Sequence, residues 1–465
     1  MPLSLEHVAG GWQHRVRAVV ALLLLLLPTL AAAQTPPPSI TLTDLGATEG
    51  AYSEATAINH QGDVVGYTDA RNIVVWRNGV MTKLGMSGTV TAINDHGQIV
   101  GAAFNHGFIW QNGQRTDLGW GNIPEANNNQ GQVVGWSSGG WSPWASDTGF
   151  IWQNGQLTHV GTLTDVVGAS SAAVAINEQG QVVGTSDTAN GERHGFIWHH
   201  GVMTDLGTLG GARSAAVAIN DRGQVAGVSS TTSGEQHAFV WQHGVMTDLS
   251  TLGGDSSSAV AINEQGQVVG TSATADRQDH GYIWQHGVMR DLGTLGGHES
   301  RATAINEQGQ VAGHSVTATG AYRAFVWQHG VMTDLGTLGG DESRAVAIND
   351  RGQVVGFSTT PSGEQHAVLW TLTPPTPAQQ LGALKADVQQ LVTARVLNQG
   401  QGNALTAKLD AAQRSLDRGQ PKVAANQLDA FVQQVEAFQR SGVLSASQRQ
   451  PLVDQANVLI RQLQR

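Results

Sequence analysis

The sequence predicts a mainly β protein: an eight-bladed β-propeller of four-stranded blades, closed by an N-terminal strand and followed by a small C-terminal α-helical bundle. Three observations lead to this prediction. One unit recurs eight times along the chain. Each copy contains four short segments rich in β-branched and aromatic residues, and the two ends of the repeat are offset by one strand.

An Ala-Ile-Asn segment, or a close variant of it, marks each unit. Successive asparagines in the regular part of the chain are 43 residues apart, and the earlier ones follow spacings of 35, 34 and 49 residues. The eight asparagines are Asn59, Asn94, Asn128, Asn177, Asn220, Asn263, Asn306 and Asn349. We number the units 1 to 8 in this order.

The four segments of a unit are predicted strands. In the last units they are Val331–Leu335, Ser343–Asn349, Gln353–Ser358 and His366–Trp370, with Gly-containing turns between them. Turns such as Asn-Glu-Gln-Gly at 263–266 place a glycine where a hairpin needs a positive φ. Four strands in about 43 residues match the size of a propeller blade.

The two ends of the repeat predict a closed ring. A strand ending in Asp-Leu-Gly occurs at Thr41–Gly46, before the first unit, whereas the last unit stops at Trp370 and lacks that strand. The first strand is therefore expected to complete the last blade, which leaves no open sheet edge. An open β-solenoid is the alternative, and it would not need this offset.

Composition excludes several classes of site. The net charge is −11 and no cluster of Lys and Arg is present, so nucleic acid is not expected as a partner. The chain has no Cys, which excludes disulfides, thiolate metal sites and a Cys nucleophile. Neither a cofactor site nor a nucleotide-binding loop is predicted, because the Gly-Gly dipeptides lack the Lys and Ser/Thr of a phosphate-binding loop.

The chain divides into five predicted segments. Residues 1–33 resemble a signal peptide, with Arg15 and Arg17, an apolar run and a cleavage site after Ala33. Residues 34–39 form a linker, 40–371 the propeller, 372–377 a Pro-rich linker and 378–465 the helical bundle. The mature protein is expected to be secreted or periplasmic without a membrane span. An uncleaved anchor is the alternative, although the apolar run is short for one.

The repeats resemble the HAF family of extracellular repeat proteins. The resemblance rests on His237-Ala238-Phe239, the Asp-Leu-Gly-Thr-Leu-Gly-Gly run that starts at Asp334, and the Ala-Ile-Asn and Gly-Gln-Val-Val-Gly segments. It covers residues 40–371, but units 1 to 3 depart from it, for example at Asn72 and Thr148 in place of the His. The resemblance implies an exported bacterial protein with no established activity, and it identifies no catalytic residue.

The C-terminal segment has helical spacing. Its first apolar stripe contains Leu381, Leu384, Val388 and Leu391. We expect Asn403 to cap the second helix, Pro421 to open the third, Ser445 or Ser447 to begin the fourth, and Gly419 and Gly442 to end the helices between. The segment resembles the FIMAH domain through Leu405–Gly419 and Ser441–Ser445. That resemblance implies an accessory binding or attachment module, and a solubilising cap is the alternative.

Most of the seventeen His residues recur with the repeat and are therefore interpreted as structural. One set precedes Gly in tight turns, where earlier units have Asn. A second set is expected to be hydrogen-bonded and not to bind a metal: His106, His194, His237, His280 and His366. The recurring aspartates, including Asp205 and Asp248, are interpreted as strand-end hydrogen-bond acceptors, and the eight recurring tryptophans as core residues between blades.

Four tryptophans have no counterpart in the other units: Trp120, Trp136, Trp141 and Trp144. They are the candidate ligand-binding residues, because exposed aromatic rings on one rim suit stacking against sugar rings. The alternative is that they fill a gap left by the short units. We predict a non-catalytic binding or adhesion scaffold with a polysaccharide or a cell-surface protein as partner. The alternatives are a polysaccharide hydrolase or lyase on a propeller, and a structural envelope protein without a small ligand.

Overall fold

The computed structural model describes residues 38–47, 52–139 and 146–464. The predicted signal peptide lies outside these residues. The chain separates into a compact unit of β-strands, Ser39–Thr373, and a second compact unit that includes the helices of residues 374–464. No helix in the described ranges is long and apolar enough to cross a membrane.

The β-strands of units 1 to 4 form antiparallel groups of four in chain order. Unit 1 has β2 (Ser53–Ile58), β3 (Val64–Thr68), β4 (Asn72–Arg77) and β5 (Val80–Ser87), with a short 3-10 turn, η1 (Asp69–Arg71), before β4. Unit 2 has β6 (Thr89–Ile93), β7 (Ile99–Ala103), β8 (His106–Gln111) and β9 (Gln114–Trp120). Unit 3 has β10 (Asn122–Asn127), β11 (Val133–Ser137), β12 (Thr148–Gln153) and β13 (Gln156–His159). Unit 4 has β14 (Ser171–Ile176), β15 (Val182–Asp187), β16 (Arg193–His199) and β17 (Val202–Asp205).

Units 5 to 8 continue the pattern. Unit 5 has β18 (Gly210–Ile219), β19 (Val225–Thr231), β20 (Gln236–Gln242) and β21 (Val245–Asp248). Unit 6 has β22 (Gly253–Ile262), β23 (Val268–Thr274), β24 (Asp279–Gln285) and β25 (Val288–Asp291). Unit 7 has β26 (Gly296–Ile305), β27 (Val311–Thr317), β28 (Tyr322–Gln328) and β29 (Val331–Asp334). Unit 8 has β30 (Ser343–Ile348), β31 (Gln353–Thr359) and β32 (Gln365–Thr373), to which β1 (Ser39–Gly46) adds the fourth strand.

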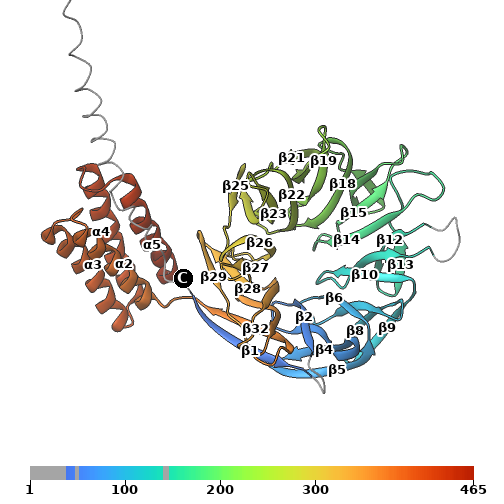
Figure 1. Cartoon of the computed structure of the whole chain (residues 1–465), viewed down its shortest axis with the longest axis horizontal. Coiled ribbons are helices and arrows are strands. Elements are labelled where there is room, and N and C mark those ends of the chain that lie inside the picture. Colours follow the sequence, from blue (N-terminus) through green and yellow to red (C-terminus); the bar gives the residue numbers. More distant parts are fainter. Residues whose placement is uncertain (1–37, 48–51, 140–145, 465) are drawn as a thin grey trace, which may run out of the picture. The chain divides into compact units, whose positions relative to one another are not determined.

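The sheets stand side by side around a central opening, with the first strand of each unit nearest the centre and the fourth strand outermost (Figure 1). Five sheets have four strands and one has twelve. The twelve-stranded sheet joins units 4, 5 and 6 through single parallel pairs, Arg193 with Arg213 and Gln236 with Ser256. This propeller-like arrangement agrees with the predicted order of strands.

Two features of the backbone explain why each unit folds in this way: a turn residue with a positive φ, and a glycine in the second strand. The seven His-Gly or Asn-Gly turns between third and fourth strands have a positive φ at the first residue, from 49° at His243 to 52° at His329 and Asn154. Asn and His tolerate this conformation better than most residues. In each second strand a glycine, such as Gly270, lies so close to the first strand that a Cβ would be 1.9 to 2.1 Å from a backbone oxygen. Only glycine fits beside this bulge of the first strand.

The chain closes the ring with its own first strand. β1 pairs antiparallel with β32, from Ser39 opposite Thr373 to Gly46 opposite Ala367. His366 Nδ1 is 2.9 Å from an Asp44 carboxylate oxygen across this pair. The sheet of unit 8 therefore contains strands from both ends of the ring, as the offset in the sequence predicts.

A circuit of hydrogen bonds between neighbouring units runs around the ring, at the turn that follows the first strand of each unit. It is formed by the Ala-Ile-Asn asparagines, which we call the ring asparagines. The side-chain Nδ2 of each Ala-Ile-Asn asparagine donates to the backbone carbonyl of the same asparagine in the next unit. The donors are Asn59, Asn94, Asn128, Asn177, Asn220, Asn263, Asn306 and Asn349, and the last donates back to Asn59 at 2.9 Å. All eight side chains are buried. The marker of the repeat is thus the residue that links neighbouring units.

The hydrophobic core of the ring lies between neighbouring sheets. One cluster, for example, packs Val269 and Ile283 of unit 6 against Val311, Phe325 and Trp327 of unit 7. The recurring tryptophans belong to such clusters, and Trp76 and Trp370 are almost completely buried. Their prediction as core residues is confirmed.

Four helices make up the C-terminal unit: α2 (Pro377–Thr393), α3 (Gln399–Asp417), α4 (Pro421–Arg440) and α5 (Ala446–Gln464). Leu381, Leu384, Val388 and Leu391 face its core as predicted. Gly419 and Gly442, with φ of 66° and 75°, follow the ends of α3 and α4, and Pro421 opens α4.

One predicted cap is wrong. Asn403 lies inside α3, and its side chain accepts from Gln399 Nε2 on the same helix. The helix begins one turn earlier because Asn398 caps it: the Asn398 side chain accepts from Gln401 N, and the Gln401 side chain accepts from Asn398 N. This reciprocal capping box outweighs the single Asn signal at 403.

Candidate ligand-binding surface of the ring

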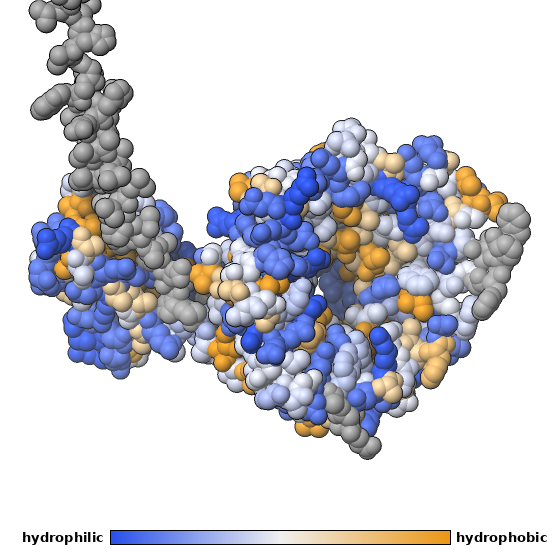
Figure 2. All heavy atoms as spheres, in the orientation of Figure 1, coloured by the Kyte–Doolittle hydropathy of each residue, from blue (hydrophilic) through white to orange (hydrophobic). Residues whose placement is uncertain are grey.

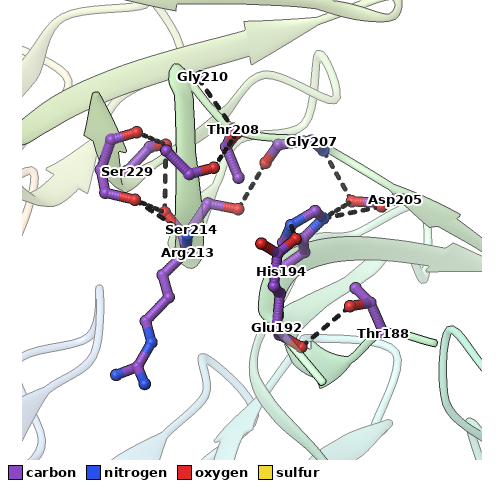
Figure 3. A network of polar contacts seen from close by, with 12 residues as sticks. Thr188, Glu192, His194, Asp205, Gly207, Thr208, Gly210, Arg213, Ser214 and Ser229 are labelled. Carbon is purple, nitrogen blue, oxygen red and sulfur yellow. Dashed lines mark hydrogen bonds and ion pairs between the residues drawn. The ribbon is translucent and has the colours of Figure 1, made fainter. Parts of the chain in front are cut away.

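The connection between units 4 and 5 shows what most polar repeat residues do (Figure 3). Asp205 accepts from His194 Nδ1 at 2.9 Å and from Gly207 N at 2.7 Å. Ser214 Oγ donates to the Gly207 carbonyl, and Thr208 Oγ1 donates to the Gly211 carbonyl. These bonds hold the turn from the outermost strand of one unit to the innermost strand of the next.

The same bonds recur around the ring. The His Nδ1 atoms lie 2.8 to 3.2 Å from carboxylate oxygens in the pairs His106–Asp117, His194–Asp205, His237–Asp248, His280–Asp291 and His366–Asp44. Backbone N–H groups also donate to Asp205, Asp248, Asp291 and Asp334. The predictions of hydrogen-bonded histidines and of strand-end aspartates are confirmed. Figure 3 shows such bonds between side chains and backbone that join neighbouring strands.

At one end of the central channel, the residue after the Ala-Ile-Asn asparagine adds a second set of bonds in seven of the eight units. Its side-chain oxygen accepts from the backbone N–H of the equivalent residue in the preceding unit, at 2.7 to 3.0 Å. The seven accepting side chains are Asp95, Asn129, Glu178, Asp221, Glu264, Glu307 and Asp350. Burial is the main cause of a raised pKa at Glu264. A cavity of about 350 Å³ opens here, beside the ring asparagines.

Another position of the first strand is exposed near the centre of the ring. Val260 is 40% exposed although it lies in β22, a strand nearest that centre, where Figure 2 shows a hollow. The wall of this hollow carries apolar surface. The equivalent residues are Thr56, Thr91, Glu125, Val174, Val217, Val260, Thr303 and Val346.

Unit 3 is the one unit that places a charge at this position. Glu125 lies at the bulge of β10, where β10 pairs with β11, and its Oε1 accepts from Trp136 Nε1 at 3.0 Å. Burial raises the pKa of Glu125, and the bond from Trp136 offsets part of that rise. A carboxyl group of the first strand and an indole of the second strand are therefore held together in unit 3.

Two residues further along β10, unit 3 also departs from the repeat. Asn127 stands where the other seven units have Ile, and it lines the cavity at the end of the channel. Its Nδ2 donates to the Gln98 carbonyl of unit 2 at 2.8 Å. The first strand of unit 3 thus gives the channel wall a carboxyl group and an amide in place of aliphatic or Thr side chains.

The predicted tryptophans are placed as follows. Trp120 ends β9, directly before β10, and is 50% exposed. Trp136 pairs with Ile123, the second residue of β10, and is partly buried. Both therefore lie at the beginning of β10. Trp141 and Trp144 lie outside the described residues.

Sequence reasoning missed Glu125, although a signal for it was present. The Ala-Val-Ala-Ile-Asn strand reads Pro-Glu-Ala-Asn-Asn at 124–128, so three of its positions change together. Acidic residues recur in every unit, so a single acidic departure does not stand out by residue type. We call Trp120, Glu125, Asn127 and Trp136 the unit 3 surface.

The helical segment has a recognised counterpart. Residues 381–461 match the FIMAH domain. The match covers α2 to α4 almost completely and most of α5. It confirms the predicted resemblance of the C-terminal segment to the FIMAH domain. No curated protein matches the chain.

Several solved structures align with much of the chain at low identity. A puromycin-hydrolyzing peptidase of Mycobacterium tuberculosis shares 14% identity over 73% of this chain, with a TM-score of 0.39, and the aligned region spans only 52% of the peptidase. The WD40 domain of SCAP from fission yeast shares 10% identity over 72% of this chain and 95% of its own, with a TM-score of 0.40. An Aleuria aurantia lectin shares 10% identity over 51% of this chain and 94% of its own, with a TM-score of 0.29. At these values the strand pairing of the chain itself carries the fold assignment.

Proposed function

We propose that residues 40–371 form an eight-bladed β-propeller of the HAF-repeat type that acts as a non-catalytic binding scaffold for a glycan. Each unit supplies four strands, and units 4 to 6 count as three blades joined by single bridges. In this proposal the signal peptide at 1–33 directs export of the protein, and the FIMAH domain serves as an accessory attachment module. A cell-surface protein is the alternative partner.

The observation that carries the proposal is the half-exposed Trp120, which ends β9 directly before β10, the strand that carries the Glu125–Trp136 pair. In the connections that follow the last strands of units 4 to 7, the third residue after the strand-end aspartate is a threonine that is hydrogen-bonded within the connection, as at Thr208. Trp120 takes this position in unit 2 and leaves its ring partly in solvent. An aromatic face with a nearby carboxyl group offers both the stacking and the hydrogen bonding that a neutral sugar ring requires.

A carboxyl group alone does not supply glycoside hydrolysis, because that reaction uses a pair of carboxylates. Among the four residues of the unit 3 surface Glu125 is the one carboxyl group, and it is bonded to the Trp136 indole. This favours binding without turnover over the hydrolase or lyase alternative.

The test is retention of the full chain on immobilised neutral polysaccharides, compared with Trp120→Ala and with Glu125→Val, the residue of the regular units. Both variants should weaken retention at least tenfold, and Trp120→Ala should leave the unfolding temperature nearly unchanged because half of the side chain is already in solvent. Val245→Ala, which truncates another exposed apolar side chain, is the matched control.

Full retention by both variants would overturn the proposal. Chain cleavage of a retained polysaccharide by the wild type, lost in Glu125→Gln, would favour the hydrolase or lyase alternative. Retention of a purified surface protein but of no polysaccharide would favour the protein partner.

A further inference from the structure

We propose that the groove between units 4 and 5 is a second binding site, specific for a carboxylate-bearing sugar such as a uronic acid residue. This groove lies away from the unit 3 surface, and the inference does not depend on the function proposed there. It encloses about 320 Å³, at the lower end of the range for small-molecule sites.

Beside this groove, unit 4 lacks a side-chain contact that four other units make at the equivalent positions. In units 3, 5, 6 and 7 a Gln at the start of the second strand donates its Nε2 to a Gln at the end of the third, at 3.1 to 3.2 Å. These pairs are Gln132–Gln153, Gln224–Gln242, Gln267–Gln285 and Gln310–Gln328. In unit 4 the second glutamine is replaced by His199, whose Nε2 donates to the Gln179 carbonyl at 3.2 Å.

Without a Gln–Gln hydrogen bond in unit 4, the side-chain Nε2 of Gln181 remains a donor at the groove. Gln181 lines it, and its Oε1 accepts from Asn177 Nδ2, whereas its Nε2 has no partner among the described residues. Arg222, from the first turn of unit 5, also lines the groove. Its guanidinium forms no ion pair or hydrogen bond in the described part of the chain, although its charge partly offsets the raised pKa of Glu264 in unit 6. Two donor groups without a hydrogen-bond partner, one of them charged, therefore line the same groove.

The groove is also distinct in charge. Its lining contains Arg222, His199 and His243 but no Asp or Glu. The surrounding ring is acidic: residues 38–373 contain 13 Lys and Arg against 29 Asp and Glu, a net charge of −16. A cationic, donor-rich groove in an acidic ring selects an acceptor with negative charge, and guanidinium groups bind carboxylates through charge-assisted hydrogen bonds.

The opposite wall is apolar and restricts the ligand further. Ile197, Val202 and Trp241 line it, and Val202 is 66% exposed. A free phosphate or sulfate ion has no apolar face to cover this wall. A sugar ring that carries a carboxylate has both features, since its C–H face packs on aliphatic and aromatic groups while its carboxylate meets Arg222 and Gln181.

Neighbouring grooves provide matched controls within the same chain. At the groove between units 5 and 6, the residues equivalent to His199 and Arg222 are Gln242 and Gln265. The variant His199→Gln/Arg222→Gln therefore gives groove 4/5 the side chains of its neighbour. The variant Gln242→His/Gln265→Arg does the reverse and builds the proposed site one unit later.

The experiment is isothermal titration of the full chain with trigalacturonate, with a neutral trisaccharide and with inorganic phosphate. We expect trigalacturonate to bind one site, at least tenfold more tightly than either other probe, and more weakly as salt is raised. His199→Gln/Arg222→Gln should weaken binding at least tenfold, and Gln242→His/Gln265→Arg should add a second site.

Unchanged affinity in His199→Gln/Arg222→Gln would overturn the proposal, as would equal binding of the neutral trisaccharide. Equal binding of phosphate would show a simple anion site and would also overturn it. Trp120→Ala should leave trigalacturonate binding intact. Loss of binding in that variant would move the uronate site to the unit 3 surface, so failure of this inference can be told apart from failure of the function proposed above.

Discussion

Units 4 to 7 and unit 3 use the same backbone but different side chains on the channel. Both keep the ring asparagine, as Asn263 in unit 6 and Asn128 in unit 3, and both keep the glycine beside the first-strand bulge. Unit 3 nevertheless has Glu125 and Asn127 where unit 6 has Val260 and Ile262. The bonds that close the ring are therefore independent of the residues that face the channel, which leaves those residues free to differ.

The largest expected effect comes from removing the ring asparagine, which both regions keep. Asn263→Ala removes bonds to the Asn306 carbonyl, the Gln267 side chain and two backbone N–H groups at a site that is 3% exposed. Buried donors and acceptors left without partners cost about 1 to 3 kcal/mol each, so we expect a loss of about 3 to 5 kcal/mol. Chemical unfolding followed by tryptophan fluorescence reports on the ring and not on the helical unit, because no tryptophan lies beyond Trp370.

Asn128→Ala should cost about as much, since it removes the same links in unit 3. Gln265→Ala, at an exposed neighbouring position, should change stability by less than about 0.5 kcal/mol. A much smaller cost for Asn128→Ala than for Asn263→Ala would show that unit 3 is not held by the same circuit.

A second effect depends on pH and on His314 of unit 7, which is not found at the equivalent position of the other units. Burial and the nearby Arg344 and Arg301 lower the pKa of His314 to about 4. An unfolded histidine has a pKa near 6.5, so between pH 6.5 and 4 the unfolded state binds more protons and the ring loses stability as pH falls. At pH 5 this loss is about 2 kcal/mol.

The variant His314→Thr tests this, because Thr185 and Thr271 occupy the equivalent position in units 4 and 6. The difference in unfolding free energy between the variant and the wild type should shift in favour of the variant as pH is lowered from 7.5 to 5. Parallel pH profiles for the two proteins would contradict the assignment.

The smallest effect concerns a hydroxyl group in the core of unit 6. Tyr282 is fully buried, and its hydroxyl has no partner within the described structure. The equivalent residue of unit 5 is Phe239. Tyr282→Phe should therefore stabilise the ring by about 1 kcal/mol, because it removes a buried group without a hydrogen bond.

The reverse change is the control for this comparison. Phe239→Tyr should destabilise the ring by about 1 to 3 kcal/mol in the same unfolding experiment. If both changes are neutral, the cores of units 5 and 6 admit water or relax at this position.

Much of the fold could be predicted because each signal recurs. The offset between Thr41–Gly46 and Trp370 predicted the pairing of β1 with β32, and the exchange of Asn for His before Gly predicted a turn with positive φ. Asn403 was predicted wrongly because a single capping residue occurs often inside helices, whereas the reciprocal bonds of Asn398 and Gln401 depend on two residues together.

The candidate sites were predicted less well, for a physical reason. The pairing of Glu125 with Trp136 requires knowledge of the bulge in β10, which brings a first-strand side chain beside the second strand. The groove at His199 requires knowledge of a contact that the other units make and unit 4 does not. Neither a bulge register nor a missing contact can be read from residue types alone.

Closure of the ring by β1 also constrains the order of folding. Ser39 pairs with Thr373, so a chain made from its N-terminus must carry β1 without its partner until every unit has been synthesised. Ile40 and Leu42, which pack in the core of the closed ring, stay uncovered for that time. Pairing of such distant segments is slow, and an uncovered strand edge invites association with other chains. The last step of folding is thus the one most exposed to error.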